Sequence, residues 1–193
     1  MTKVLLTGFE PFGKATLNPS GEIVKQISGD NIVTAILPVA YAQSAERLLA
    51  LITEHNPDVV ICLGQAEGRT QITPERIAIN LDDARLADNE GVIRNDVPII
   101  VGGPVAYEST LPIKDFVKAI NDAGIPATVS LSAGAFLCNH VFYVAQNKFV
   151  GTKVRSGFVH VPLMDEQAGE FPGLPTMPLD QMAKAVRAML EVL

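Results

Sequence analysis

The chain has 193 residues and a mass of 20.6 kDa, which fits one domain over residues 1–193 better than two small ones. The net charge is −6 and the Lys and Arg residues form no cluster. Nucleic acid and anionic membranes are therefore poor partners on electrostatic grounds. No apolar run approaches the ~20 residues of a membrane helix, and no signal peptide is recognisable. Two cysteines make no disulfide framework, so a reducing cytoplasm is expected.

The first half of the chain alternates apolar strands with amphipathic helices. Asn18 followed by Pro19 predicts a helix start, because Asn caps a helix and Pro fits its first position. Apolar residues at i, i+3, i+4 and i+7 predict a second helix over residues 42–54. The predicted strands of this half are residues 4–7, 32–37, 59–63 and the half-exposed 76–82.

The second half opens with a turn-rich stretch, residues 83–107, in which we expect an extended piece at residues 97–101. Residues 128–131 predict a strand leading into a helix that ends near residue 147. The remaining predicted elements are a strand at residues 157–161, helices near residues 113–120 and 179–190, and a proline-rich loop at residues 162–178. The Met and Phe side chains of that loop are expected to be exposed.

This alternation predicts the α/β class. We expect a single three-layer α/β/α domain with a central twisted, mostly parallel mixed sheet. In such sheets the reactive groups gather where strands hand over to loops and helices.

Cys138 is the candidate nucleophile. A turn of small residues, 132–135, runs directly into the apolar helix that contains it. Near a helix start the macrodipole favours a thiolate, and the free N–H groups could bind an oxyanion. A cysteine on an apolar helix can also serve packing alone. Cys62, inside a continuous apolar strand, is expected to be an inert core thiol.

The chain offers only three histidines as a base for that thiol. His160 ends a predicted strand just before Pro162, which places it near the functional edge of the sheet. His140 lies two residues beyond Cys138, so the two side chains point to different sides of the helix. His55 lies at a helix end, where capping is its ordinary use. His160 is the better candidate, although a histidine in an apolar strand can be a core residue.

A third group would orient the imidazole, and Glu75 is the best candidate. It follows Thr73 and Pro74 at the entrance to a predicted strand. The residues alone do not select it firmly over Glu67 or the pair Asp82 and Asp83. We expect that pair to be a solvated strand end rather than half of a metal site.

Six motifs, in chain order, resemble the pyrrolidone-carboxylate peptidase family (pyroglutamyl peptidase type I), which are cysteine peptidases. They are residues 7–13 (TGFEPFG), 18–20 (NPS), 64–69 (GQAEGR), 72–80 (ITPERIAIN), 132–139 (SAGAFLCN) and 158–162 (FVHVP). The resemblance runs nearly end to end. It implies hydrolysis of an N-terminal pyroglutamyl (5-oxoproline) residue from peptides, through a thioacyl-enzyme intermediate, on a phosphorylase/hydrolase-like fold.

The resemblance also implies roles for individual residues. Cys138 would be the nucleophile, His160 the general base and acid, and Glu75 the orienting carboxylate. The walls of the lactam pocket would be Phe9, Phe12, Phe136 and Leu137, with Asn18 and Gln65 as hydrogen-bonding groups. Arg85 matches an arginine near the family's oxyanion region.

Further expectations follow from the same resemblance: no cofactor or metal, a cytosolic location and a homotetramer. This chain departs from the family pattern at Glu67, where glycine is common, and at Leu86, where isoleucine is common. Glu67 would change the electrostatics at the pocket mouth. Residues 169–178 match the family less distinctively.

Two other classes of function are compatible with such a fold. A small-molecule binding module would use the Phe9 and Phe12 slot without chemistry. A nucleoside-phosphorylase-like enzyme would need a phosphate cradle, and residues 64–69 make a weak one.

Overall fold

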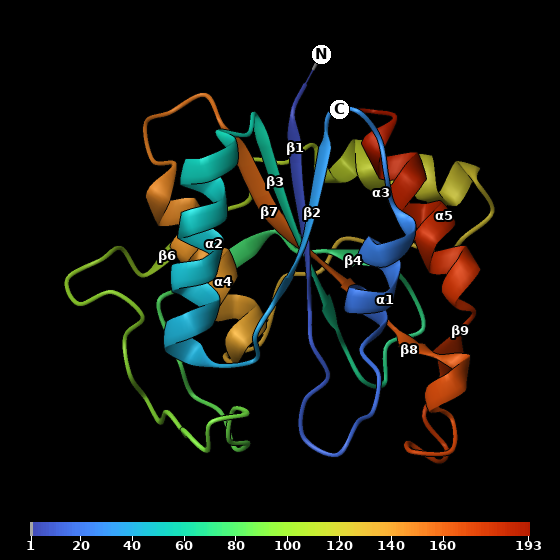
Figure 1. Ribbon diagram of the computed structural model, residues 1–193, viewed down its shortest axis with the longest axis horizontal. Helices are drawn as coiled ribbons and strands as arrows, with labels where there is room; N and C mark the ends of the chain where they lie inside the picture. Colours follow the sequence, from blue (N-terminus) through green and yellow to red (C-terminus); the bar gives the residue numbers. More distant parts are fainter. Residues whose placement is uncertain (1) are drawn as a thin grey trace.

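The computed structural model describes residues 2–193 and is built around a five-stranded sheet in the order β2-β1-β3-β7-β4 (Figure 1). Four strands pair in parallel: β1 (Val4–Phe9), β2 (Ile32–Leu37), β3 (Val59–Gln65) and β7 (Arg155–Val161). A short edge strand, β4 (Thr73–Pro74), pairs antiparallel to β7. The sheet is therefore mostly parallel and mixed, as the sequence predicts.

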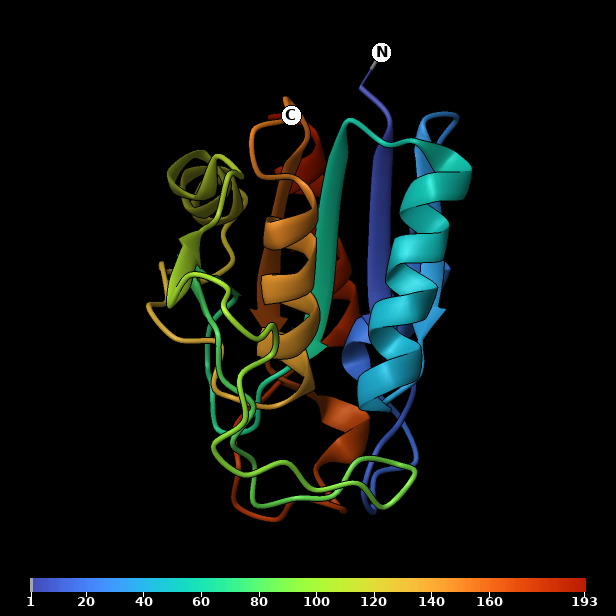
Figure 2. The ribbon, with the colours of Figure 1, turned by 90° about the vertical axis from the view of Figure 1, so that its left-hand side faces the viewer.

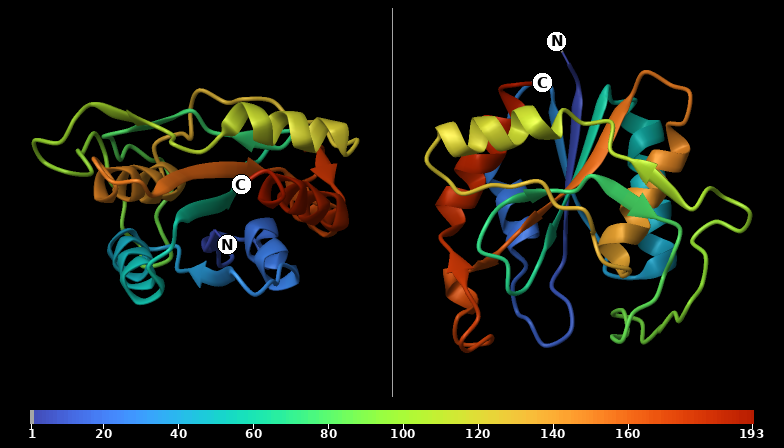
Figure 3. Two further views of the ribbon diagram at one scale, coloured as in Figure 1. Left: turned by 90° about the horizontal axis from the view of Figure 1, so that it is seen from above. Right: turned by 180° about the vertical axis from the view of Figure 1, so that it is seen from behind.

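Helices cover both faces of the sheet, which makes the three layers. On one face lie α2 (Tyr41–His55) and α4 (Leu137–Lys148), side by side in Figure 2. On the other face lie α1 (Pro19–Gln26) and α5 (Leu179–Leu190), with α3 (Ile113–Asp122) beside α5 (Figure 3). The α1 start is as predicted, since the Asn18 side chain accepts a hydrogen bond from the Ser20 N–H at 3.1 Å.

Strand alternation divides the core between the two faces. On β3, Val60 and Cys62 pack with α2 and α4, whereas Ile61 and Leu63 pack with α1 and α5. Cys62 is fully buried, so the prediction of a core thiol is confirmed. The same alternation turns Gly64, two residues beyond Cys62, toward the layer that contains α4.

Two of the predicted strands are wrong. Residues 128–131 form no strand; the segment makes only one isolated bridge, Ser130 to Glu75, and a second, Ala127 to Ile72, comes just before it. The segment runs beside a two-residue edge strand, which is too short to support a continuous ladder. Of the predicted extended piece at residues 97–101, only Val97 forms a bridge, with Asp82. The strand observed near this stretch is β6 (Ala106–Glu108), which pairs with β5 (Ile77–Ile79).

The loop at residues 162–178 is also packed differently from the prediction. Its large side chains Met164, Phe171 and Met177 are buried rather than exposed. The segment is held by β8 (Leu163–Met164), the 3₁₀ helix η1 (Asp165–Gln167) and β9 (Thr176–Met177). The loop at residues 82–105 projects from the rest of the molecule (Figure 1). It carries most of the exposed large apolar side chains instead: Leu86, Val92, Ile93, Val97, Val101 and Val105.

None of the helices described for residues 2–193 is both long and apolar enough to cross a membrane.

Candidate active site

A cavity of about 290 Å³ opens where β1 and β3 end and α4 begins. This edge is the place where a parallel sheet gathers functional side chains. The cavity is lined by eight of the ten predicted site residues: Phe9, Phe12, Asn18, Gln65, Phe136, Leu137, Cys138 and His160. Glu75 lies behind His160, and Arg85 is elsewhere.

Cys138 is the second residue of α4, where the helix meets the cavity. No side chain caps this helix start. The turn before it depends on Gly134, whose φ of 75° favours glycine. The first N–H groups of a helix have no intrahelical acceptor, so those of this turn are free to face a developing oxyanion.

The sulfur of Cys138 lies over Gly64 of β3 and lines the same cavity as His160. Gly64 on β3 pairs in register with His160 on β7, so both residues face the same side of the sheet. A Cβ built on Gly64 would lie 2.8 Å from the Cys138 sulfur and 2.6 Å from the Phe158 ring. The missing side chain of Gly64 therefore makes the space in which the thiol and the imidazole share one cavity.

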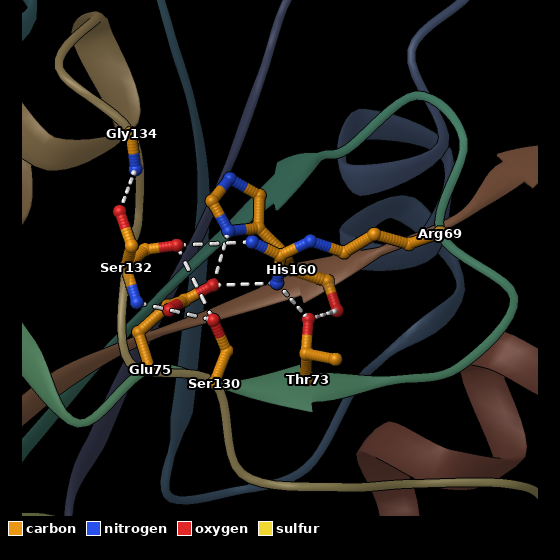
Figure 4. A network of polar contacts seen from close by, with 7 residues as sticks. All are labelled: Arg69, Thr73, Glu75, Ser130, Ser132, Gly134 and His160. Carbon is orange, nitrogen blue, oxygen red and sulfur yellow. Dashed lines mark hydrogen bonds and ion pairs between the residues drawn. The ribbon is translucent and has the colours of Figure 1, made fainter.

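Glu75 is hydrogen-bonded to His160. Nδ1 of the ring lies 2.7 Å from Oε1 of the carboxylate, which is fully buried (Figure 4). This contact leaves Nε2 of the ring free for a proton. Burial would raise the pKa of Glu75, but the hydrogen bond and charge of His160, with the charge of Arg69, outweigh burial and lower it. Glu75 is thus held ionised.

The ring of His160 is held neutral. It is only 4% exposed, and burial lowers its pKa below the ordinary value of 6.5, although Glu75 opposes this. A neutral imidazole with a free Nε2 can accept a proton at neutral pH.

The helix start favours a thiolate at Cys138, but burial acts against it. Burial of the thiol, followed by the charge of Glu75, raises the pKa of Cys138 to about 12. Arg69 and the backbone N–H of Cys138 act in the opposite direction but are outweighed. The resting group is therefore a thiol, which needs a base when it attacks.

The other candidate carboxylates have different positions. Asp82 is fully buried, so the predicted solvated strand end is wrong for this residue, while Asp83 is exposed. Asp82 accepts from Arg94 at 2.7 Å and lies 2.9 Å from Nδ1 of His140. That second histidine–carboxylate pair joins the projecting loop to α4 and leaves Glu75 as the partner of His160.

Two predicted polar groups line the cavity. Oδ1 of Asn18 accepts from both the N–H and the hydroxyl of Ser20, and its Nδ2 donates to the Glu10 carbonyl at 2.9 Å. One N–H of Asn18 is left over. Oε1 of Gln65 accepts from Gln167 at 2.9 Å. Nε2 of Gln65 is buried and has no partner among residues 2–193.

Arg85 is not brought to the site. Its side chain is exposed, and it is absent from the lining of the cavity. Glu67, by contrast, is exposed at the cavity and lines it. Across residues 2–193, no group of three His, Cys, Asp or Glu side chains is arranged to hold a metal ion.

Two residues of the site were missed by sequence reasoning. Asn139 is buried beside the thiol; it accepts from the Ile79 N–H and donates to the carbonyls of Ile79 and Leu81 at 2.9–3.0 Å. The sequence could have indicated Asn139, because it is a polar residue in the first turn of an otherwise apolar helix. Arg69 lines the cavity and binds Glu75. Because its guanidinium is committed there, residues 64–69 are a poor phosphate cradle.

A thiol at a helix start, in one cavity with an imidazole that is backed by a buried carboxylate on an α/β sheet, is typical of cysteine-dependent hydrolases. The comparisons with known proteins give the particular family. A sequence profile described as "Pyroglutamyl peptidase" matches residues 2–193. The chain therefore belongs to the pyroglutamyl peptidase family, the C15 cysteine peptidases.

Individual relatives agree with this assignment. The pyrrolidone-carboxylate peptidase of Bacillus thuringiensis is 46% identical over 199 aligned positions, which cover 100% of this chain and 93% of the relative. The crystal structure of pyroglutamyl peptidase I from Bacillus amyloliquefaciens is 44% identical, with a TM-score of 0.94, covering 98% of this chain and 95% of that one. A mutant pyrrolidone carboxyl peptidase from Pyrococcus furiosus is 41% identical, with a TM-score of 0.92, covering 98% and 97%.

Proposed function

We propose that this chain removes the N-terminal pyroglutamyl residue from peptides through a thioacyl enzyme formed on Cys138. The observation that carries the proposal is that Cys138 and His160 line one small cavity, with Glu75 bonded to the ring from behind. Family membership supplies the substrate class.

The first step is attack by sulfur on the pyroglutamyl carbonyl. Nε2 of His160 takes the thiol proton as the C–S bond forms, and Glu75 stabilises the resulting imidazolium. The carbonyl oxygen becomes an oxyanion facing the free N–H groups at the start of α4, a donor set worth ~10²–10³-fold in rate. His160 then gives its proton to the leaving amine, and the C–N bond breaks.

The second step is hydrolysis of the thioester. His160, neutral again, takes a proton from water as the water attacks the thioester carbonyl. The C–S bond breaks, the sulfur recovers a proton and free pyroglutamate leaves. No metal or redox partner is needed, since the proton taken in each half of the reaction is returned within it.

The cavity suits a neutral five-membered lactam. Phe9, Phe12 and Phe136 supply apolar walls, and the Phe12 and Phe136 rings lie 6.1 Å apart. The free Nε2 of Gln65 can donate to the ring carbonyl of the substrate. Asn18 lines the same cavity and keeps one amide N–H that can donate to the substrate.

Recognition of a lactam also explains rejection of uncyclised glutamate or glutamine. Either would carry an ammonium group into the apolar slot, where an unpaired charge costs several kcal/mol. A substrate that leaves the buried polar groups of the site unpaired can be rejected by ~10⁴-fold relative to one that pairs them.

The proposal is tested by comparing wild-type protein with the Cys138→Ala variant on a pyroglutamyl amide that releases a fluorescent amine. The wild type should cleave it and reject the matching prolyl amide, which lacks the ring carbonyl. The variant should be folded and inactive. Cleavage by the folded variant at the wild-type rate would disprove the nucleophile.

The family resemblance further leads us to propose a homotetramer in the cytoplasm. The relatives named above are proteins of Bacillus and Pyrococcus. The exposed apolar side chains of the loop at residues 82–105 supply surface that an assembly could bury.

A further inference from the structure

We infer that Arg69 is a positioning residue of the active site, which holds the Glu75 carboxylate against His160 and ties it to the segment that precedes Cys138. The inference rests on the peptidase reaction proposed above, and no role was assigned to this arginine by the sequence patterns. It stands on three contacts of one guanidinium, to Thr73, Glu75 and Ser132 (Figure 4).

The first contacts join Arg69 to Glu75, the partner of His160. Nη1 of Arg69 donates to Oε1 of Glu75 at 2.7 Å, the same oxygen that Nδ1 of His160 approaches at 2.7 Å. Nη1 also donates to the hydroxyl of Thr73, which in turn donates to the backbone carbonyl of His160 at 3.5 Å. The guanidinium therefore fixes both the carboxylate and the strand edge beside the histidine.

The next contact reaches the other half of the site. Nη2 of Arg69 donates to the carbonyl of Ser132 at 3.0 Å. Ser132 begins the small-residue turn that leads into α4, and its hydroxyl accepts from the Gly134 N–H at 3.2 Å. One planar fork thus spans the carboxylate and the turn that aims Cys138, which a lysine could not do with a single ammonium.

The charge of Arg69 acts on the same groups. It lies beside a fully buried carboxylate, while its own side chain is 27% exposed. Its charge helps to lower the pKa of Glu75 and, after burial, contributes to the lowered pKa of His160. The titratable or charged groups near the ring are Glu75 beside β4, Cys138 on α4, and Arg69 and Glu67 on the loop after β3.

Removal of the Arg69 charge should change the pKa of His160 in one definite direction. A positive charge near imidazole disfavours imidazolium, so its loss raises the pKa of His160. The acid limb of the kcat/KM profile then moves to higher pH, because the base is protonated earlier as the pH falls. Loss of the fork also lets the carboxylate and the turn move, which should lower kcat by about 10- to 100-fold. KM should change little, because the lactam walls are untouched.

The experiment compares Arg69→Met, Arg69→Gln and Arg69→Lys with an exposed control, Arg47→Met on α2. The Met and Gln variants should lose kcat and shift the acid limb upward. Lysine keeps the charge but not the fork, so it should hold the acid limb near the wild-type position and recover kcat only in part. The control should match the wild type.

The inference is overturned if all three Arg69 variants keep the wild-type kcat and acid limb. It is also overturned if kcat falls only in proportion to lost thermal stability, with the acid limb unmoved. Proton NMR titration of His160, in a chain with only three histidines, needs no turnover. An upward shift of its pKa in the Met or Gln variant would therefore support the inference even if the wild type failed to cleave pyroglutamyl substrates.

Discussion

At the scale of single residues, the site is governed by burial. Burial neutralises His160 and raises the pKa of Cys138 to about 12, so the resting pair is an imidazole and a thiol. Glu75 is the one group of the three that stays charged, because His160 and Arg69 both contact it. Proton transfer within the reaction, rather than a resting ion pair, is what this arrangement favours.

The pH dependence of activity follows from the lowered pKa of His160. The base works only when it is neutral, and a lowered pKa keeps it neutral further into acid. The acid limb of kcat/KM should therefore lie below pH 6.5, the ordinary value for histidine. A pH–rate profile with a peptide-like amide substrate measures it, and an acid limb clearly above that value would contradict the prediction.

Loss of the Glu75 charge should be less severe than loss of the nucleophile. A glutamine at position 75 can still accept from His160 and Arg69, but it cannot stabilise the imidazolium. We expect Glu75→Gln to lower kcat by ~10²–10⁴-fold and to leave measurable turnover, whereas Cys138→Ala leaves none. Wild-type activity in Glu75→Gln would show that the carboxylate has no part in the reaction.

At the scale of elements, the start of α4 is held from two sides. Asn139 binds the backbone at the end of β5, and the carbonyl of Ala135 accepts from the Asp83 N–H at 2.9 Å. Asp82 and His140, which follows Asn139 in the same turn, add a buried polar contact. These bonds fix the helix that carries the thiol to the loops that surround it.

A substitution at Gly64 tests how closely β3 and α4 approach each other. In Gly64→Ala the new methyl would meet the Phe158 ring and the Cys138 sulfur at 2.6 and 2.8 Å, so the sulfur or the ring must move. A displaced nucleophile costs on the order of 10²-fold in kcat. The matched control is Gly169→Ala, where a Cβ meets nothing within 4 Å. Equal activity in the two variants, measured at matched folded fraction, would contradict the close contact.

The regular elements were predictable where local pattern decides them. The start of α1 follows from Asn18 and Pro19, and β3 follows from its continuous apolar run. Residues 128–131 were mispredicted, because a strand also needs a partner and only the short β4 lies beside them. The burial of Met164 and Met177 could not be read locally either, since it depends on packing against distant helices.

At the scale of the whole molecule, the site unites segments that are far apart in the chain. Glu75 and His160 are separated by 85 residues, and Arg69 and Ser132 by 63. Parallel pairing predicted that strand ends would meet at one edge, which was enough to favour His160. It did not choose among four acidic residues, because that choice depends on the loop paths that turn Asp82 toward His140 instead.

The proposed tetramer is a prediction at this scale. Val101 is 88% and Val105 84% exposed in the single chain, and several exposed apolar side chains grouped on one loop are typical of an interaction surface. Light scattering coupled to gel filtration should give four times the chain mass of 20.6 kDa at micromolar concentration. A monomer mass over the whole concentration range would contradict the assembly.

The most direct test of the central claim is capture of the acyl enzyme. A pyroglutamyl nitrophenyl ester has a good leaving group, so acylation is fast and thioester hydrolysis becomes the slow step. Rapid acid quenching followed by mass spectrometry should show one pyroglutamyl unit on the peptide that contains Cys138 and no adduct on Cys62. A burst of nitrophenol of matching size should accompany it. Steady turnover with no burst and no adduct on Cys138 would contradict the account.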